Sequence, residues 1–206
     1  MTENMFPPAT QEESTGNKRK AIVDAAREIF ARQGYEATTI AEIAARAGIA
    51  VGTVYLYFRN KREIYLDTSQ SWVMEIAAVL IRPELLYLPI EQVPRTMIEQ
   101  IFEICRANSR LMSLVQIDVQ TPEELEVKRH SKQLITQAVN AFFLQCVARG
   151  DFLSFDTEMY AKIIYGLVNN VIYDCFCLDG GTNEEVYRER TIELLERVFF
   201  GPSLRG

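Results

Sequence analysis

The sequence contains few of the residues with which enzymes and metal proteins carry out their chemistry. His130 is the single histidine among 206 residues, and the four cysteines, Cys105, Cys146, Cys175 and Cys177, are scattered. A zinc site needs paired ligands at short spacings with partners nearby, and these residues do not offer that arrangement. Because a Ser-His-Asp set and a glycine-rich phosphate loop are also missing, we predict no enzyme, no cofactor and no metal site. We expect the thiols to be buried and reduced, as in a cytoplasmic protein.

Long uninterrupted apolar runs are missing as well. The apolar stretch at residues 163–171 is interrupted by Asn169 and Asn170, whereas a membrane-spanning helix needs about 18 apolar residues. We therefore predict no membrane segment. The first 16 residues lack a basic stretch followed by an apolar one, which argues against a secretory signal, and we expect them to form a disordered tail.

The alternating pattern of β-strands is almost absent, whereas apolar residues recur at helical spacing along the chain. Hydrophobic residues make up 48% of the sequence, enough to bury a sizeable core. We predict an all-α protein with a three-helix DNA-binding domain at 17–62 and a helical ligand-binding and dimerisation domain at 63–206. The roughly nine expected helices cover about residues 18–33, 39–47, 51–58, 61–80, 90–107, 109–119, 122–148, 156–178 and 183–200.

Charge is distributed unevenly along a chain whose net charge is −6. Residues 17–62 carry nine basic and four acidic side chains, a net charge of +5, whereas residues 63–206 carry a net charge of −8. A basic module joined to an acidic body is typical of a protein with one end that faces nucleic acid.

The basic segment has the layout of a helix-turn-helix unit. Thr38 and Thr39 are both good N-caps for its second helix, and Thr39 and Glu42 have the spacing of a capping box. Gly48 marks the sharp turn before the third helix. In such units the third helix lies in the major groove of double-stranded DNA while the preceding helix contacts the backbone. The segment is therefore predicted to bind DNA.

A set of residues at fixed spacing makes the identification more specific: Gly34, Tyr35, Thr38, Thr39, Ile43, Ala44, Ala47, Gly48, the run 52–58 and Lys61. This pattern closely resembles the N-terminal signature of the TetR/AcrR family of repressors. The resemblance implies an all-helical homodimer that binds operator DNA. It also implies DNA contacts by Thr38, Thr39, Val51, Gly52, Thr53, Tyr55, Tyr57 and Lys61.

Several residues of this segment have a second interpretation. Tyr55 could pack in the three-helix core instead of contacting DNA, and Phe58 is expected in that core. Arg46 is expected on a solvated face. Val51 is apolar, and Ala41 stands where the fold would tolerate a base-reading side chain. We therefore expect few base-specific hydrogen bonds, with methyl contacts and DNA shape contributing to specificity.

From about residue 69 onward the chain is more apolar than a DNA reader needs. The resemblance implies a ligand pocket and a dimer interface there, and the apolar character of residues 156–178 on all sides is typical of a helix buried between partners. Pocket candidates, each of which could instead be plain core, are Trp72, Phe102, Arg106, Met112, Gln116, Phe143, Tyr165, Asn169 and Tyr173. Interface candidates on the last two helices are Ile164, Leu167, Val168, Val171, Ile172, Leu194, Leu195 and Val198.

These patterns predict a dimeric DNA-binding transcriptional regulator, most simply a repressor. Its operator affinity is expected to be lowered by a small hydrophobic ligand, such as an acyl thioester or a drug-like compound. The alternative is a DNA-binding protein without a small-molecule effector. The expected partners are operator DNA, a second copy of the chain and the effector, with no membrane.

Overall fold

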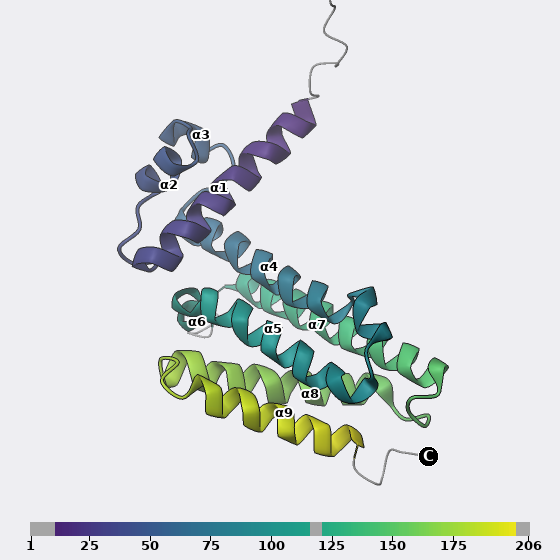
Figure 1. The fold of residues 1–206 in the computed structure, drawn as a ribbon. Coiled ribbons are helices and arrows are strands. Elements are labelled where there is room, and N and C mark those ends of the chain that lie inside the picture. The colour runs from purple at the N-terminus through teal and green to yellow at the C-terminus, as the bar shows by residue number, and fades with distance from the viewer. Residues whose placement is uncertain (1–10, 116–120, 201–206) are drawn as a thin grey trace, which may run out of the picture. The chain divides into compact units, whose positions relative to one another are not determined.

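A computed structural model describes residues 11–115 and 121–200 of the chain. All regular structure within these residues is helical, which confirms the predicted all-α class (Figure 1). Nine α-helices lie in this part of the chain: α1 (Gln11–Gln33), α2 (Ile40–Arg46), α3 (Val51–Val54), α4 (Lys61–Leu80), α5 (Val93–Ala107), α6 (Ser109–Val115), α7 (Pro122–Arg149), α8 (Thr157–Tyr173) and α9 (Glu184–Phe200).

Three helix ends differ most from the expected ones. The first helix, α1, begins at Gln11 and so includes the last residues of the expected tail, whose first ten residues lie outside the described part. The recognition helix α3 ends at Val54 instead of Phe58, because β-branched and aromatic side chains favour helix only weakly. Helix α8 ends at Tyr173 and continues as one π-helical turn, Asp174–Leu178. Residues 116–119 of the expected sixth helix lie outside the described residues.

The chain divides into two compact units, an N-terminal unit up to Thr68 and a C-terminal unit from Ser69 onward. This border lies within α4, later than the border expected at residue 62. Helix α4 therefore contributes its first turns to one unit and its remaining turns to the other.

The N-terminal unit has a small core of buried apolar side chains. Ile22 of α1, Ile43 of α2, Val54 of α3 and Ile64 of α4 are fully buried, and Phe58 is 2% exposed. Each helix thus contributes an apolar side chain to the core, with α2 packed against α1 and α3 packed against α2.

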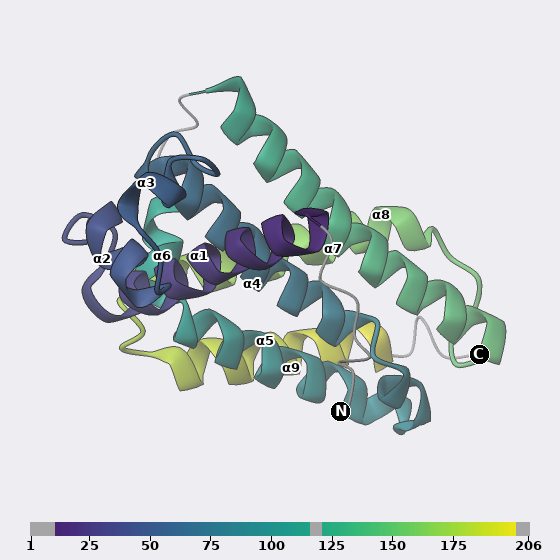
Figure 2. The ribbon, with the colours of Figure 1, turned by 90° about the horizontal axis from the view of Figure 1, so that it is seen from above.

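The C-terminal unit is a bundle in which α7 packs against α8 and α5 packs against α9 (Figures 1 and 2). Thr121 caps α7 by accepting a hydrogen bond from the backbone N–H of Glu124 (3.2 Å). Gly150 ends α7 with a φ of 84°, a left-handed conformation that glycine adopts without strain. The long α7 is therefore delimited by a local capping signal at each end.

The four cysteines are free thiols within this bundle. Cys105, Cys146 and Cys175 are buried, and Cys177 is half-buried. Burial raises the pKa of Cys146 and of Cys175 to about 11. A thiol with such a pKa stays protonated near neutral pH, so these residues act as small apolar side chains.

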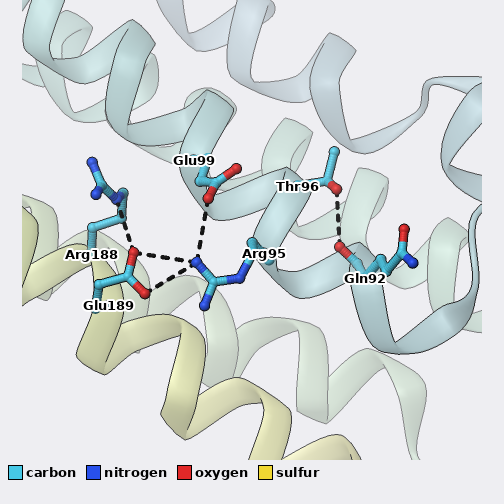
Figure 3. A network of polar contacts seen from close by, with 6 residues as sticks. All are labelled: Gln92, Arg95, Thr96, Glu99, Arg188 and Glu189. Carbon is cyan, nitrogen blue, oxygen red and sulfur yellow. Dashed lines mark hydrogen bonds and ion pairs between the residues drawn. The ribbon is translucent and has the colours of Figure 1, made fainter.

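A network of charged side chains joins α5 to α9 at the surface of the bundle (Figure 3). Nη1 of Arg95 lies 3.1 Å from Oε2 of Glu189 and 3.4 Å from Oε1 of Glu99. The hydrogen bond from Arg95 lowers the pKa of Glu189, and the same bond raises the pKa of Arg95. Because all three side chains are largely exposed, the network contributes little to stability and mainly aligns the two helices.

Candidate DNA-binding surface and ligand cavity

The recognition segment, residues 51–57, presents Val51, Tyr55 and Leu56 to solvent, whereas Thr53 and Tyr57 are half-buried. Tyr55 is 54% exposed and Val51 is 40% exposed, whereas Val54 and Phe58 are anchored in the core. Tyr55 is therefore a surface residue, and the interpretation of it as core is wrong. Leu56 is 81% exposed and was not among the predicted contact residues. In the sequence, Leu56 could be found only from its position between the buried residues Val54 and Phe58. That pattern can be interpreted only once the end of α3 is known.

Gly52 lies on this segment in an unusual setting for a glycine. It has no positive φ, and a Cβ added to it would meet no atom of the chain within 4 Å. Glycine within a helix costs about 1 kcal/mol relative to alanine. Neither backbone strain nor internal packing accounts for glycine here, so the absent side chain leaves room for something outside the domain.

The start of α2 is held by the predicted capping box. The hydroxyl of Thr39 accepts a hydrogen bond from the Glu42 N–H (3.2 Å), and the Glu42 carboxylate accepts one from the Thr39 N–H (2.8 Å). The Thr39 hydroxyl also donates a hydrogen bond to this carboxylate (2.8 Å). Hydrogen bonds from the Thr39 backbone, the Thr39 hydroxyl and Gln33 lower the pKa of Glu42. Thr39 lies at the surface with these groups engaged by Glu42.

Thr38 does not fit the predicted phosphate contact. Its side chain is 1% exposed, and its hydroxyl donates a hydrogen bond to the carbonyl of Gly34 (2.7 Å). Its N–H donates to the carbonyl of Tyr35 (3.2 Å). Both donors of Thr38 therefore close the turn between α1 and α2, and the residue is structural.

Lys61 is likewise occupied within the N-terminal unit. Its ammonium group donates to the carbonyls of Tyr35 (2.7 Å), Thr38 (2.8 Å) and Glu36 (3.2 Å). The same group lies 4.3 Å from the centroid of the Tyr35 ring. An ammonium has three protons to donate. All three bind the loop after α1, so the predicted pairing of Lys61 with phosphate is not what this geometry shows.

Several cations of the basic segment are paired inside the N-terminal unit. Nε of Arg19 lies 3.1 Å from a carboxylate oxygen of Asp67, and the guanidinium lies 4.5 Å from the Phe58 ring centroid. Arg46 lies on the surface, as expected, and pairs with Glu28 at 2.5 Å. The excess of positive charge in residues 17–62 is thus partly neutralised by neighbouring carboxylates.

The C-terminal unit contains a cavity of about 450 Å³. Trp72, Met112, Phe143, Tyr165 and Asn169 line it, as predicted. Burial raises the pKa of Tyr165, which stays a neutral phenol in this setting. Apolar walls with a few polar groups, and a volume in this range, are typical of small-molecule sites.

The other pocket candidates have different places. Phe102 is fully buried core, and Tyr173 is half-buried outside the cavity wall. Nε of Arg106 lies 3.2 Å from a carboxylate oxygen of Glu184, so this arginine forms a surface ion pair. Gln116 lies outside the described residues. Helical spacing cannot separate a cavity wall from solid core, because both faces are apolar.

An uncovered apolar face runs along α8 and α9. Met159 and Ile163 of α8 are 50% and 57% exposed, and Val186 of α9 is 59% exposed. The predicted interface residues Leu194 and Val198 belong to this face, at 43% and 41% exposure. We call these five residues the α8–α9 face.

The remaining interface candidates do not share this face equally. Ile172 and Leu195 are buried, and with Ile164 and Val168 they line the cavity. Leu167 and Val171 are half-buried.

The stretch Thr157–Leu178 is long and apolar enough to cross a membrane, with a mean hydropathy of 1.2, and 22% of it is buried. Exposed apolar surface of this kind is typical of interaction sites.

Comparisons with known proteins agree with this architecture. Residues 22–68 match the model of the bacterial regulatory proteins, tetR family. The fatty acid metabolism regulator protein of Bacillus subtilis is 46% identical over 50 residues, which are 24% of this chain and 26% of that protein. The uncharacterised HTH-type transcriptional regulator YerO of the same organism is 30% identical over 115 residues, 55% of this chain and 40% of the relative. The matches thus span less than half the length of these two relatives.

Solved structures extend the similarity to the whole fold. A TetR-family transcriptional regulator from Syntrophomonas wolfei superposes with a TM-score of 0.71 at 17% identity, covering 91% of this chain and 97% of that one. The transcriptional regulator FadR of Bacillus subtilis, solved in complex with stearoyl-CoA, gives a TM-score of 0.64 at 19% identity, covering 85% and 96%. Residues 22–68 thus match a tetR-type helix-turn-helix domain, and the fold of the chain is that of these solved regulators.

Proposed function

We propose that this chain binds operator DNA as a homodimer and acts as a repressor that a small hydrophobic ligand releases. The recognition segment carries the proposal: it is exposed on a core of buried apolar side chains, and it includes a glycine that nothing inside the domain requires. An exposed helix-turn-helix segment is shaped for the major groove.

The chemistry of the recognition segment indicates how it reads DNA. Val51 and Leu56 offer apolar contacts to thymine methyl groups, and Tyr55 offers a hydroxyl to phosphate oxygens. Thr39, at the start of α2, adds a second hydroxyl. Gly52 lets the sugar-phosphate backbone approach closely. With so few base-edge hydrogen bonds, each domain discriminates weakly, and two copies that read two half-sites supply the missing specificity.

The α8–α9 face supports a homodimer. Its apolar side chains are exposed along two helices, and covering them with the same face of a second copy gives a four-helix arrangement. Arg190 and Arg197 of α9, which pair with Glu193, provide a charged surface beside the apolar residues. A polar surround of this kind is common at protein interfaces.

The cavity supports an effector. Helix α4 is continuous from Lys61 to Leu80, so one helix carries both the lysine that holds the α1–α2 loop and cavity residues such as Trp72 and Ile76. A ligand that binds one position of α4 better than another shifts the equilibrium between DNA-binding and released states. The apolar wall, the shared fold of a regulator solved with stearoyl-CoA, and the relative named for fatty acid metabolism together favour an acyl thioester.

A gel-shift titration on the DNA upstream of the chain's own gene tests the proposal. We expect a specific complex at submicromolar protein whose affinity falls steeply as salt concentration rises. The variant Gly52→Gln adds a side chain into open space and so should fold, yet it should weaken the complex more than tenfold. Ala148→Gln, at an exposed position near the end of α7, is the matched control and should bind as the wild type does.

Two results would contradict parts of the proposal. Equal operator affinity of Gly52→Gln and the wild type would show that the recognition segment does not contact the DNA. A specific complex that no acyl thioester or other hydrophobic compound weakens would instead favour the DNA-binding protein without an effector.

A further inference from the structure

The two ends of the cavity differ in chemistry. At one end Phe143, Phe152 and Phe199 pack ring against ring, with Phe143 and Phe199 centroids 5.4 Å apart. At the other end Lys132 of α7 lies 5.9 Å from the ring centroid of Tyr165 of α8. Lys132 and Phe143 are eleven residues apart on one helix, which separates them by about 16 Å along its axis. The cavity is therefore elongated, with an aromatic end and a polar end.

The charged side chains that line the polar end are all cations. Lys128, Arg129 and Lys132 contribute to the wall, and no aspartate or glutamate is found among the lining residues that the structure describes. This is notable in a chain with 28 acidic side chains, whose net charge beyond residue 62 is −8. The composition of the unit favours carboxylates at any given surface position, so a purely basic cavity end is a local feature.

Two of these cations have no carboxylate partner. Nη1 of Arg129 lies 2.8 Å from Oε1 of Glu126, which neutralises it. Neither Lys128 nor Lys132 takes part in any ion pair within the described residues. They are four residues apart on α7, so they lie on the same side of the helix, one turn apart. Lys132 is exposed, so this end of the cavity opens to solvent.

From this arrangement we infer that the cavity takes an amphipathic anion, with its tail toward the aromatic end and its anionic head held by Lys128 and Lys132. The inference rests on the proposed effector role of the cavity, and it adds the charge and the orientation of the ligand. Hydrogen bonds between an ammonium and an anionic oxygen are stronger than neutral ones, and they position a ligand whose apolar tail alone could slide. A carboxylate and the phosphates of an acyl thioester carrier both have this head chemistry.

Ligands with one tail and different heads test the inference. Trp72 is the single tryptophan and lines the cavity, so the fluorescence of the full chain reports binding directly. Dodecanoate, lauroyl-CoA, 1-dodecanol and dodecyltrimethylammonium share a twelve-carbon chain. We expect dodecanoate or lauroyl-CoA to bind at least tenfold more tightly than dodecanol, and the cationic ligand to bind most weakly. Tight binding of lauroyl-CoA alone identifies phosphate as the head, and equal binding of dodecanoate identifies a carboxylate.

A double variant assigns the preference to its residues. Lys128→Gln combined with Lys132→Gln should weaken binding of the preferred anion about tenfold and leave dodecanol binding unchanged. Lys162→Gln is the matched control, because Lys162 lies on α8, pairs with Glu158 and does not line the cavity. Dodecanol that binds as tightly as both anions, or a double variant with unchanged anion affinity, would overturn the inference.

The readout separates this inference from the proposed function, because no DNA is present. Lysine-dependent anion binding that leaves the operator complex intact would support the inference and count against the effector role. Release of the operator by dodecanol, together with equal binding of dodecanol and the two anions, would support the effector role and contradict the inference.

Discussion

The two units of the chain differ in what lies between their helices. In the N-terminal unit Ile22, Phe30, Ile43 and Val54 are fully buried in the core. The C-terminal unit keeps about 450 Å³ unfilled between its helices. Protein interiors are normally close-packed, and unfilled volume lowers stability. The first unit is thus built to hold a surface in one shape, and the second is built to admit a further molecule.

The units also differ in how they place charge. The N-terminal unit pairs Arg19 and Arg46 of its basic segment with its own carboxylates. The acidic C-terminal unit leaves Lys128 and Lys132 at its cavity without an ion pair among the described residues. Net charge along the sequence therefore says little about the individual sites on the two units.

The largest loss of stability is expected from truncating a buried side chain in the core of the N-terminal unit. Phe58→Ala removes a ring that is 2% exposed and that Arg19 covers at 4.5 Å. Truncation of a buried phenylalanine costs about 3–5 kcal/mol, so the N-terminal unit should unfold at lower denaturant concentration and operator binding should be lost. Leu56→Ala, at an 81% exposed position, is the control. Its free energy of unfolding should change by less than about 0.5 kcal/mol. Equal destabilisation by both variants would argue against the core described for this unit.

A smaller loss of stability is expected from Lys61→Gln. The variant cannot satisfy the three carbonyls of the α1–α2 loop, and a buried acceptor left without a partner costs about 1–3 kcal/mol. Chemical denaturation measures this loss, and the slope of operator affinity against salt concentration tests the alternative role. A phosphate contact would change that slope by about 0.9, whereas we expect no change. Arg59→Gln, at a side chain that is 90% exposed, should leave stability unaltered.

The contrast in packing can be removed by filling the cavity. Val168→Phe adds a ring at the cavity wall, and such a change within spare volume should alter the free energy of unfolding by less than about 1.5 kcal/mol. Binding of the twelve-carbon anions, followed by Trp72 fluorescence, should weaken more than tenfold while operator affinity persists. The control is Leu144→Phe, on α7 at 53% exposure and away from the cavity. Unchanged anion binding in Val168→Phe would place the ligand elsewhere.

The smallest effect concerns the capping box of α2. The pKa of Glu42 is lowered by hydrogen bonds from Thr39, so its ionised form stabilises the folded state. This contribution is complete above the ordinary glutamate pKa of 4.5 and is lost as pH falls through the lowered value. An NMR titration of the Glu42 carboxyl should show the lowered pKa, and Thr39→Ala, which removes the hydroxyl but keeps the backbone N–H, should raise that pKa only part of the way to the ordinary value. An ordinary pKa for Glu42 in the wild type would contradict the capping interaction.

Much of the N-terminal unit could be predicted from sequence because its signals are local. Thr39 with Glu42, and the apolar spacing of α1, each fix an element within a few residues. The roles of Thr38 and Lys61 could not be predicted from sequence, because their partners are backbone carbonyls whose position depends on the folded loop. In the C-terminal unit α8 is apolar on several sides, so periodicity could not separate exposed Ile163 from cavity-lining Val168.

The unfilled cavity also makes the C-terminal unit the compressible part of the molecule. Unfolding eliminates internal voids, so its volume change is negative and scales with the void volume that is lost. Hydrostatic pressure therefore favours unfolding of the unit that holds this cavity of about 450 Å³. A ligand that occupies the cavity removes that contribution to the volume change.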